Sequence, residues 1–343
     1  ETLCIEAHIV AMQKRRAVPV DIYEVRWRRV TFFYMLALSV PALFWILPQD
    51  FSPDIALTAA SFAPMVAAVF VIRWCNDEKP ADALGLRYWP GVVFWWLFAV
   101  IAPVCVVALT LGVDIMLPGV EYTPDFAGVL KRIAADEGPE KAAEMKAIFA
   151  NSTAHPLLPV LANSLVMGPT LNAITAFGQE AAWRGWLLRE LSPMGFWRAS
   201  LVAGLMSGLW NTPAVLKGWQ YPALEAYPVF GVALATSLCI AESPLAVLIQ
   251  WQTHSTMATS IFRGISNAVG SLDFFMINVS TGHAALDEIL VGSTGIAGLI
   301  ASLLCALCIR VFSTLFGARV LPSTLDVWFP VPLPSDTESE KQK

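Results

Sequence analysis

Residues 157–185 read LLPVLANSLVMGPTLNAITAFGQEAAWRG, an apolar run that passes directly into a charged turn. The apolar part, residues 157–177, has about the 20 residues that an α-helix needs to cross a bilayer. Glu180 and Arg184 follow at i,i+4 spacing, so on a helix their side chains can pair. Ionisable residues are costly at membrane depth and usually face one another or a cavity. This stretch therefore predicts a membrane helix that carries a polar site.

The rest of the chain shares this apolar character. Of its 343 residues, 56% are hydrophobic and only 14% are charged, and the mean hydropathy is +0.60. A soluble domain usually carries about 25% charged residues. Apolar runs close to membrane length occur at residues 31–47, 55–72, 91–111, 157–177, 196–216, 229–251, 253–269 and 292–312. The predicted fold is all-α: a polytopic, multi-pass integral membrane protein with about eight transmembrane helices around a polar cavity.

Hydropathy divides the chain into five parts. A polar N-terminal segment, residues 1–30, precedes N-terminal transmembrane helices at residues 31–112. The first apolar run is too long for a cleaved signal peptide and lacks a small-residue cleavage site, so we expect a retained anchor. Residues 113–156 form an extramembrane loop with two short helical patterns, and residues 157–316 form the core. Residues 317–343 are Pro-rich and then charged, which predicts a disordered tail.

Basic residues lie on one side of the predicted helices. The connections between spans two and three and between spans four and five hold Arg73, Lys79, Arg87, Arg184, Arg189 and Arg198. The short connections at residues 49–54, 218–228 and 271–290 have no Lys or Arg. The positive-inside rule therefore predicts both termini on the cytoplasmic, or equivalent, side. The net charge of −5 is spread between loops and tail and does not indicate nucleic acid as a partner.

Three polar clusters at membrane depth occur in a fixed order. They are the runs QEAAWRG at residues 179–185, WNTP at 210–213 and RGISN at 263–267. This trio resembles the CPBP family, the intramembrane glutamate endopeptidases related to type II CAAX prenyl proteases and bacterial Abi proteins. The family's motifs are often written EExxWRG, Trp-His-x-Pro and HGxxN. The order and the retained Trp, Arg, Gly, Pro and Asn match across about residues 157–270.

The chain departs from the family pattern at the residues that carry the chemistry. The resemblance implies that the first glutamate of the pair activates water and that two histidines position this water or the oxyanion. Here those positions hold Gln179, Asn211 and Arg263, whereas the family positions Glu180, Arg184 and Asn267 are retained. A glutamine or asparagine amide cannot act as a general base. The resemblance therefore implies degenerate motifs with no intact catalytic set.

These departures favour a catalytically inactive pseudoprotease. Such a protein would act as a scaffold, a binding protein or a subunit of a larger membrane complex, with membrane lipids and prenylated or other membrane proteins as partners. The alternative function is an active intramembrane CAAX-type endopeptidase with an altered site around Glu180. A third interpretation is that the polar residues only lock the helices together. Changes in all three motifs favour natural divergence over engineered inactivation, which needs only one change.

The histidines and cysteines do not indicate a metal or another cofactor. No two of His8, His155, His254 and His283 have the spacing of metal ligands. His254 has Ala258 at the position where the third motif requires Asn. Cys305 and Cys308 lie one helical turn apart in an apolar run, which is typical of small packing residues.

The motif positions also predict a geometry. Arg263 needs a counter-charge in a low-dielectric cavity, and Glu180 is the nearest candidate, although Arg184 competes for it. We expect Arg184 to lie near the cytoplasmic end of its helix, where it can reach water, and Arg263 to lie deeper. We further expect Gln179, Asn211, Arg263 and Asn267 to line one cavity that opens toward the inner side, because they would otherwise face lipid.

The topology is testable by cysteine labelling. One single cysteine placed within residues 271–290 and another in the C-terminal tail should react with an impermeant maleimide from opposite faces of the membrane. The reason is that residues 271–290 lack Lys and Arg and are therefore expected on the outer side, whereas the tail follows the last span to the inner side. Labelling of both positions from the same face would contradict this topology.

Overall fold

The computed structural model describes residues 24–46, 52–75, 79–86, 93–151, 155–279 and 283–316. Most of the polar segment 1–30 and the whole predicted tail 317–343 lie outside the described residues. The N-terminal half consists of α2 (Trp27–Ala42), η1 (Leu43–Ile46), α3 (Pro53–Ser61), α4 (Ala63–Cys75), α5 (Pro80–Ala83), α6 (Val93–Asp114), β1 (Val120–Tyr122), α7 (Ala127–Asp136) and α8 (Pro139–Asn151).

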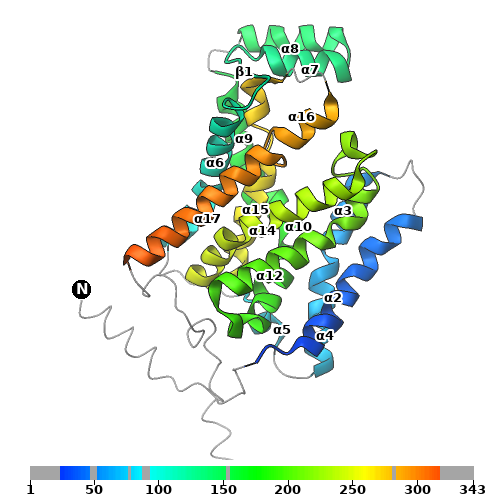
Figure 1. Cartoon of the computed structure of the whole chain (residues 1–343), viewed down its shortest axis with the longest axis vertical. Coiled ribbons are helices and arrows are strands. Elements are labelled where there is room, and N and C mark those ends of the chain that lie inside the picture. Colours follow the sequence, from blue (N-terminus) through cyan, green and yellow to red (C-terminus); the bar gives the residue numbers. More distant parts are fainter. Residues whose placement is uncertain are drawn as a thin grey trace, which may run out of the picture.

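The C-terminal half carries the three motifs. Its first elements are α9 (Leu157–Met167), η3 (Gly168–Asn172), α10 (Ala173–Glu180), η4 (Ala181–Leu187), α11 (Leu188–Glu190), η5 (Ser192–Met194), α12 (Gly195–Trp210), α13 (Thr212–Leu216) and η6 (Pro222–Leu224). They are followed by α14 (Pro228–Thr253), α15 (Thr256–Val269), η7 (Asp273–Phe275), β2 (Ile277–Val279), α16 (Ala284–Leu290) and α17 (Ile296–Phe316). The helices form an elongated bundle (Figure 1).

The protein has the predicted all-α fold of a multi-pass membrane protein. In the described residues, six helical stretches are long and apolar enough to cross a membrane: Pro53–Cys75, Val93–Asp114, Leu157–Glu190, Ser192–Leu216, Pro228–Thr253 and Ile296–Leu315. The two other predicted spans are also helical. α2 continues without a gap into η1, so the helical stretch covers residues 27–46, whereas α15 has only 14 residues.

α15 is short because it is an internal helix of the bundle. It packs against η3, α10, α6 and α14. Thr256, Thr259 and Ser260, near its start, are buried and donate hydrogen bonds to backbone carbonyls. Such bonds satisfy hydroxyl groups that lipid could not. The apolar character of residues 253–269 is therefore consistent with burial among the other helices of the bundle.

Close contact between α12 and α14 depends on a pair of small residues. Gly204 and Gly208 are four residues apart and face α14. A Cβ on Gly204 would lie 2.7 Å from the Cα of Ile240, and a Cβ on Gly208 would lie 2.7 Å from the Cα of Thr236. Small residues at this spacing allow membrane helices to approach closely. The contact holds Asn211, directly after α12, beside the middle of α14.

The N-terminal helix is held to the core by charge and by aromatic packing. Arg26 donates two hydrogen bonds to the buried carboxylate of Glu190, at 2.8 and 2.6 Å, and Arg29 lies 3.7 Å from the same group. Bidentate arginine–carboxylate pairs are among the stronger polar contacts. Phe33 of α2 packs against Trp183 and Trp186, with ring centroids 5.5 and 4.8 Å apart. The first helix therefore supports the segment that carries the first motif.

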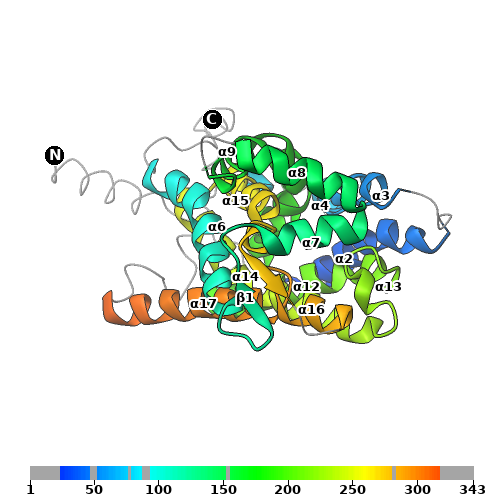
Figure 2. The same ribbon diagram turned by 90° about the horizontal axis from the view of Figure 1, so that it is seen from above.

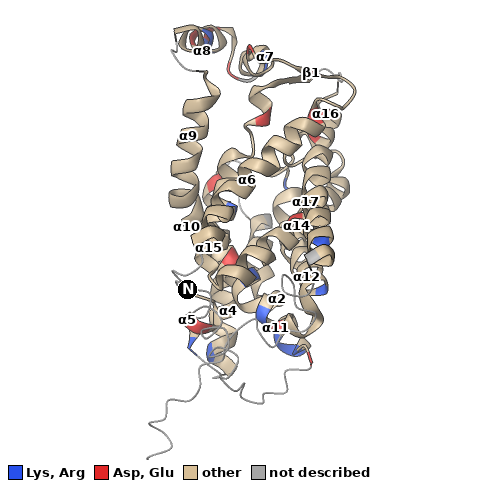
Figure 3. Ribbon diagram, turned by 90° about the vertical axis from the view of Figure 1, so that its left-hand side faces the viewer, with Lys and Arg blue, Asp and Glu red and all other residues tan. Residues whose placement is uncertain are grey.

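Basic residues lie near both ends of the bundle, and the bundle between is largely uncharged (Figure 3). One basic group surrounds α5 and α11, in the part of the chain where the sequence places the inner side. The α7–α8 hairpin at the opposite end carries Lys131, Arg132, Lys141 and Lys146. Long loops are exempt from the positive-inside rule, so this second group does not conflict with the predicted orientation. The side of the membrane on which the termini lie stays a prediction.

The loop at residues 113–156 forms a cap over that opposite end. As predicted, it contains two short helices, α7 and α8, which lie across the end of the bundle (Figures 1 and 2). β1 pairs antiparallel with β2, and this ties the loop to the segment that follows α15. Arg132 of α7 donates to the carbonyl of Phe274 and lies 4.8 Å from the centre of its ring.

Two buried carboxylates lie where the cap meets the bundle. Asp114 accepts a hydrogen bond from the backbone of Gly292 at 3.0 Å, and Asp273 accepts one from the backbone of Phe274 at 2.8 Å. The second oxygen of each carboxylate is buried without a hydrogen-bond partner among the described residues. Burial, reinforced by the negative charge of Asp114, raises the pKa of Asp273 to about 7. Protonation of Asp273 therefore favours the folded junction.

This junction should make the protein more stable in mild acid. Because the pKa of Asp273 is raised in the folded state, its contribution to stability is full below the unfolded pKa of about 3.9 and is lost as pH rises through 7. Acidification from pH 8 to pH 6 should therefore raise the thermal midpoint, by an increment equivalent to about 1 kcal/mol. Asp273→Asn should be more stable than the parent protein at pH 8 and should lose most of this pH dependence. If acidification lowers the thermal midpoint of the parent protein but not that of Asp273→Asn, protonation of Asp273 destabilises the fold and the prediction is wrong.

Candidate functional site

The first motif lies where a helix changes its winding. α10 ends at Glu180, and η4, a π-helical segment, continues directly from Ala181 to Leu187. π-helical turns inside α-helices are frequent at functional sites. Arg184 lies in this segment and donates to Glu180 Oε1 at 3.3 Å. Both side chains are only 1% exposed, so the predicted i,i+4 pair is confirmed and is fully buried.

Arg263 of α15 joins this pair to a second carboxylate. Its Nη1 atom donates to Glu242 Oε2 at 2.6 Å, and its Nε atom lies 3.7 Å from Glu180 Oε1. Arg184, Glu180, Arg263 and Glu242 therefore form a continuous line of opposite charges, here called the ion-pair chain. It connects α10 and η4 to α15 and α14, and its two formal positive and two formal negative charges cancel.

The expected contact between Arg263 and Glu180 is confirmed, but it is not the closest contact of Arg263. Its closest carboxylate is Glu242, which the motif comparison did not include. A signal was present in the sequence, because Glu242 is the one carboxylate in the apolar run 229–251. A charged residue within a membrane helix is a candidate site residue with an expected partner.

The exposure of the two arginine side chains differs from the expectation that Arg184 reaches water. Arg184 does not reach water at the end of its helix, since the continuation through η4 and α11 keeps it buried at 1% exposure. Its Nε and Nη2 atoms have no hydrogen-bond partner among the described residues. Arg263 is the more accessible cation, at 19% exposure, and its partner Glu242 is 24% exposed. Arg184 is therefore the cation that depends most on Glu180.

The glycine of the third motif brings α15 against the break between α9 and α10. A Cβ at Gly264 would lie 2.3 Å from the carbonyl oxygen of Gly168 and 2.6 Å from the backbone nitrogen of Ala173. Real Cβ atoms do not approach backbone atoms so closely, so a side chain at this position would push the helices apart. Asn172, in the same break, donates to the carbonyl of Gly264 at 3.4 Å. This packing positions Arg263, the adjacent residue, against the first motif.

A cavity of about 530 Å³ lies beside the ion-pair chain. Glu242, Arg263 and Asn267 are among its lining residues, together with residues of α6, α14 and α17. Gln179 and Asn211 are not part of the lining. Asn211 instead donates to the carbonyl of Ser207 at 3.2 Å and lies 3.9 Å from the sulfur of Cys239. Only two of the four polar residues expected to share one cavity therefore do so.

The cavity extends toward the cap and not toward the inner end. Its lining includes Gln220 and Tyr221 before α14, Ser271 and Phe274 after α15, and Thr294 before α17. These segments belong to the end of the bundle that bears α16 and the α7–α8 hairpin (Figure 1). The lining therefore does not reach the end of the bundle at which the sequence placed the opening, and the side of the membrane on which the cavity opens stays a prediction.

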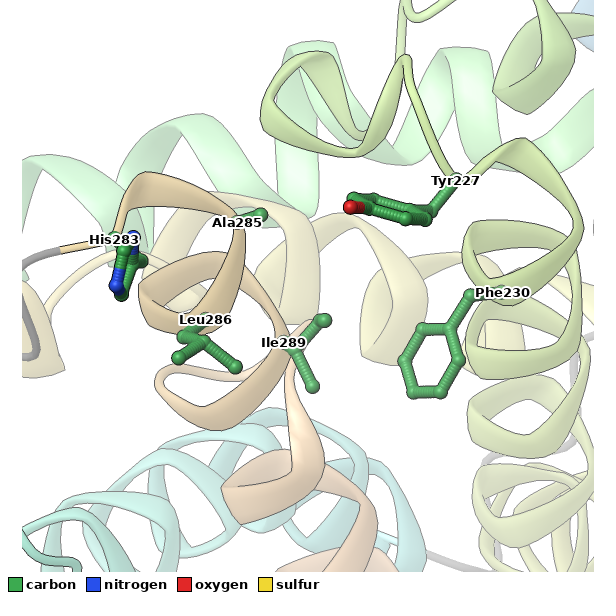
Figure 4. A pocket seen from close by; sticks show the side chains of 6 residues that line it. All are labelled: Tyr227, Phe230, His283, Ala285, Leu286 and Ile289. Atoms are coloured by element: carbon green, nitrogen blue, oxygen red, sulfur yellow. The ribbon is translucent and has the colours of Figure 1, made fainter.

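A smaller hollow of about 360 Å³ lies between α16 and the start of α14. Figure 4 shows Tyr227 and Phe230 on one side and Leu286 and Ile289 on the other, with Ala285 and His283 completing the lining. None of the motif residues contributes to it. Its aromatic and aliphatic lining is typical of a helix end near the membrane interface.

Comparison with known proteins agrees with the motif positions. Residues 161–269 match the family model described as "Type II CAAX prenyl endopeptidase Rce1-like". The matched range contains all three motifs and also Glu242. No curated protein matches the chain.

The ion-pair chain predicts unequal costs of removing its two carboxylates. Glu180→Gln leaves Arg184 buried without a counter-charge, a change that typically costs about 3–5 kcal/mol. Glu242→Gln should cost clearly less, because Arg263 retains Glu180 and is partly exposed to the cavity. Thermal unfolding in detergent would measure both, with Glu144→Gln, in an exposed pair with Lys141, as the control. An unchanged midpoint for Glu180→Gln would show that another group neutralises Arg184.

Proposed function

We propose that this protein, in which residues 161–269 form an Rce1-like type II CAAX prenyl endopeptidase domain of the CPBP family, binds membrane ligands or partners. We further propose that it does not cleave them. The single observation that carries the proposal is the ion-pair chain. Both carboxylates near the motif positions are in contact with arginine side chains, at 2.6 to 3.7 Å.

The replaced positions offer no proton acceptor for hydrolysis. A general base must take a proton from water at neutral pH. The side-chain amides of Gln179 and Asn211 do not do so, and the guanidinium of Arg263 stays protonated and has no acceptor atom. Catalytic groups that act as a unit lose most of their rate when one member is removed. Here three members are replaced.

The two remaining carboxylates are also poor substitutes for the missing base. Each accepts a hydrogen bond from an arginine side chain, so one oxygen of each carboxylate is already engaged. Glu180 contacts two guanidinium groups and is 1% exposed, so water has little access to it. This pairing supports a role for Glu180 in holding α10, η4 and α15 together.

The preserved frame supports binding. The retained glycine of the third motif still packs α15 against the α9–α10 break, and a cavity of about 530 Å³ remains beside it. This volume lies within the range of roughly 300–1,000 Å³ found for ligand sites. Membrane lipids and prenylated or other membrane proteins are the partners that fit a site within a helix bundle of this kind, and a membrane complex would use the same frame.

One observation favours the second candidate function, an endopeptidase with an altered site. Glu242 is 24% exposed and shares the cavity with Asn267. A carboxylate and an amide could in principle act as a base and an oxyanion donor. However, Glu242 Oε2 accepts the shortest hydrogen bond of the ion-pair chain, 2.6 Å from Arg263 Nη1, so this oxygen is already engaged.

The proposal predicts no proteolysis by the parent protein. Purified protein should not cleave a farnesylated CAAX peptide above the rate of a no-enzyme control, in an assay where an active CPBP protease does. Single restorations such as Gln179→Glu or Arg263→His should also be inactive, because the catalytic groups act as a unit. Only Gln179→Glu, Asn211→His and Arg263→His combined would assemble the family set. Specific cleavage by the purified parent protein, absent from a mock purification, would establish the second function instead.

A further inference from the structure

We infer that the cavity beside the ion-pair chain binds a single-chain lipid with an uncharged, hydroxyl-bearing headgroup, such as a monoacylglycerol. This inference rests on the proposed function, because it names the chemical class of ligand for the same cavity. Three features of the lining lead to it: the balance of charge, the polar wall and the apolar wall.

The charge in the cavity is balanced. Among the described lining residues, the charged side chains are Glu242 and Arg263, which are paired at 2.6 Å. The charges of Glu180 and Arg184, which are buried next to this pair, also cancel. An anionic or cationic headgroup would therefore find no unpaired counter-charge and would lose its hydration on entry. A neutral headgroup avoids this penalty.

The polar wall consists of uncharged groups near the cap. Gln220, Asn267, Ser271 and Thr294 line this part of the cavity. Their amides and hydroxyls both donate and accept hydrogen bonds, which suits the hydroxyl groups of a ligand. Ser266 and Ser293, by contrast, already donate to backbone carbonyls. The wall therefore favours a ligand that carries several hydroxyl groups over a purely apolar one.

Another part of the lining, here called the apolar wall, comes largely from α6, a candidate membrane span. Pro103, Val106 and Val107 of α6 face the cavity, and Leu245 and Phe262 line its deeper part. On α14 the lining extends from Ala235 to Leu245, a rise of about 15 Å along a helix. A volume of about 530 Å³ suits one acyl chain with a small headgroup better than a lipid with two chains.

A series of ligands with the same chain and different headgroup charge tests the inference. Radiolabelled monoolein should bind the detergent-solubilised protein, and unlabelled monoolein should compete at least tenfold better than oleyl sulfate or oleyltrimethylammonium. Val107→Trp should fill the cavity and reduce monoolein binding at least tenfold. The matched control Leu303→Trp, on the exposed face of α17, should leave binding unchanged.

A charge change gives an independent test. Glu242→Gln leaves the four side chains with one net positive charge, so competition by oleyl sulfate should strengthen at least tenfold, and competition by oleyltrimethylammonium should not. If Glu242→Gln does not fold, comparison of Val107→Trp with Leu303→Trp still tests whether monoolein binds in this cavity. Equal competition by all three ligands, or equal binding by the two tryptophan variants, would overturn the inference. Cleavage of CAAX peptides would overturn the proposed function but leave the order of competition unchanged.

Discussion

The rest of the motif region depends on one constraint: two charges, Glu180 and Arg184, are buried at 1% exposure within a membrane bundle. Neither is tolerable alone in a low-dielectric interior, so each requires the other. Arg263 and Glu242 extend the pair, and in doing so they hold α10, η4, α14 and α15 in one arrangement. The close approach of Gly264 to the α9–α10 break sets the same helices at the distance that these contacts need.

The substitution at position 263 connects packing to function. The family resemblance places a titratable ring there, whereas Arg263 carries a permanent charge. That charge engages Glu242 at 2.6 Å and approaches Glu180 at 3.7 Å. The same contacts engage an oxygen of each carboxylate, and the formal charges of the ion-pair chain cancel beside the cavity. This one replacement therefore supports two proposals, that the protein does not cleave peptides and that its cavity takes a neutral ligand.

Much of the fold could be predicted from the sequence because membrane helices satisfy their own backbone hydrogen bonds, so local hydropathy is enough to locate them. The two short helices of the 113–156 loop and the i,i+4 pair of Glu180 and Arg184 followed from local patterns. Hydropathy is less informative where burial in protein resembles burial in lipid. α15, with 14 residues, is apolar because other helices surround it, and hydropathy alone does not separate the two environments.

The sequence by itself determined the all-α membrane class, the order of the motifs and the residues that stand at each motif position, since these depend on composition and spacing. Only the tertiary structure decided which charges meet. Glu242 and Arg263 are 21 positions apart on different helices, and Arg184 is buried because η4 and α11 continue its helix. The cavity's extension toward the cap was likewise decided in three dimensions, because it depends on how α6, α14, α15 and α17 pack, and no local pattern records that packing.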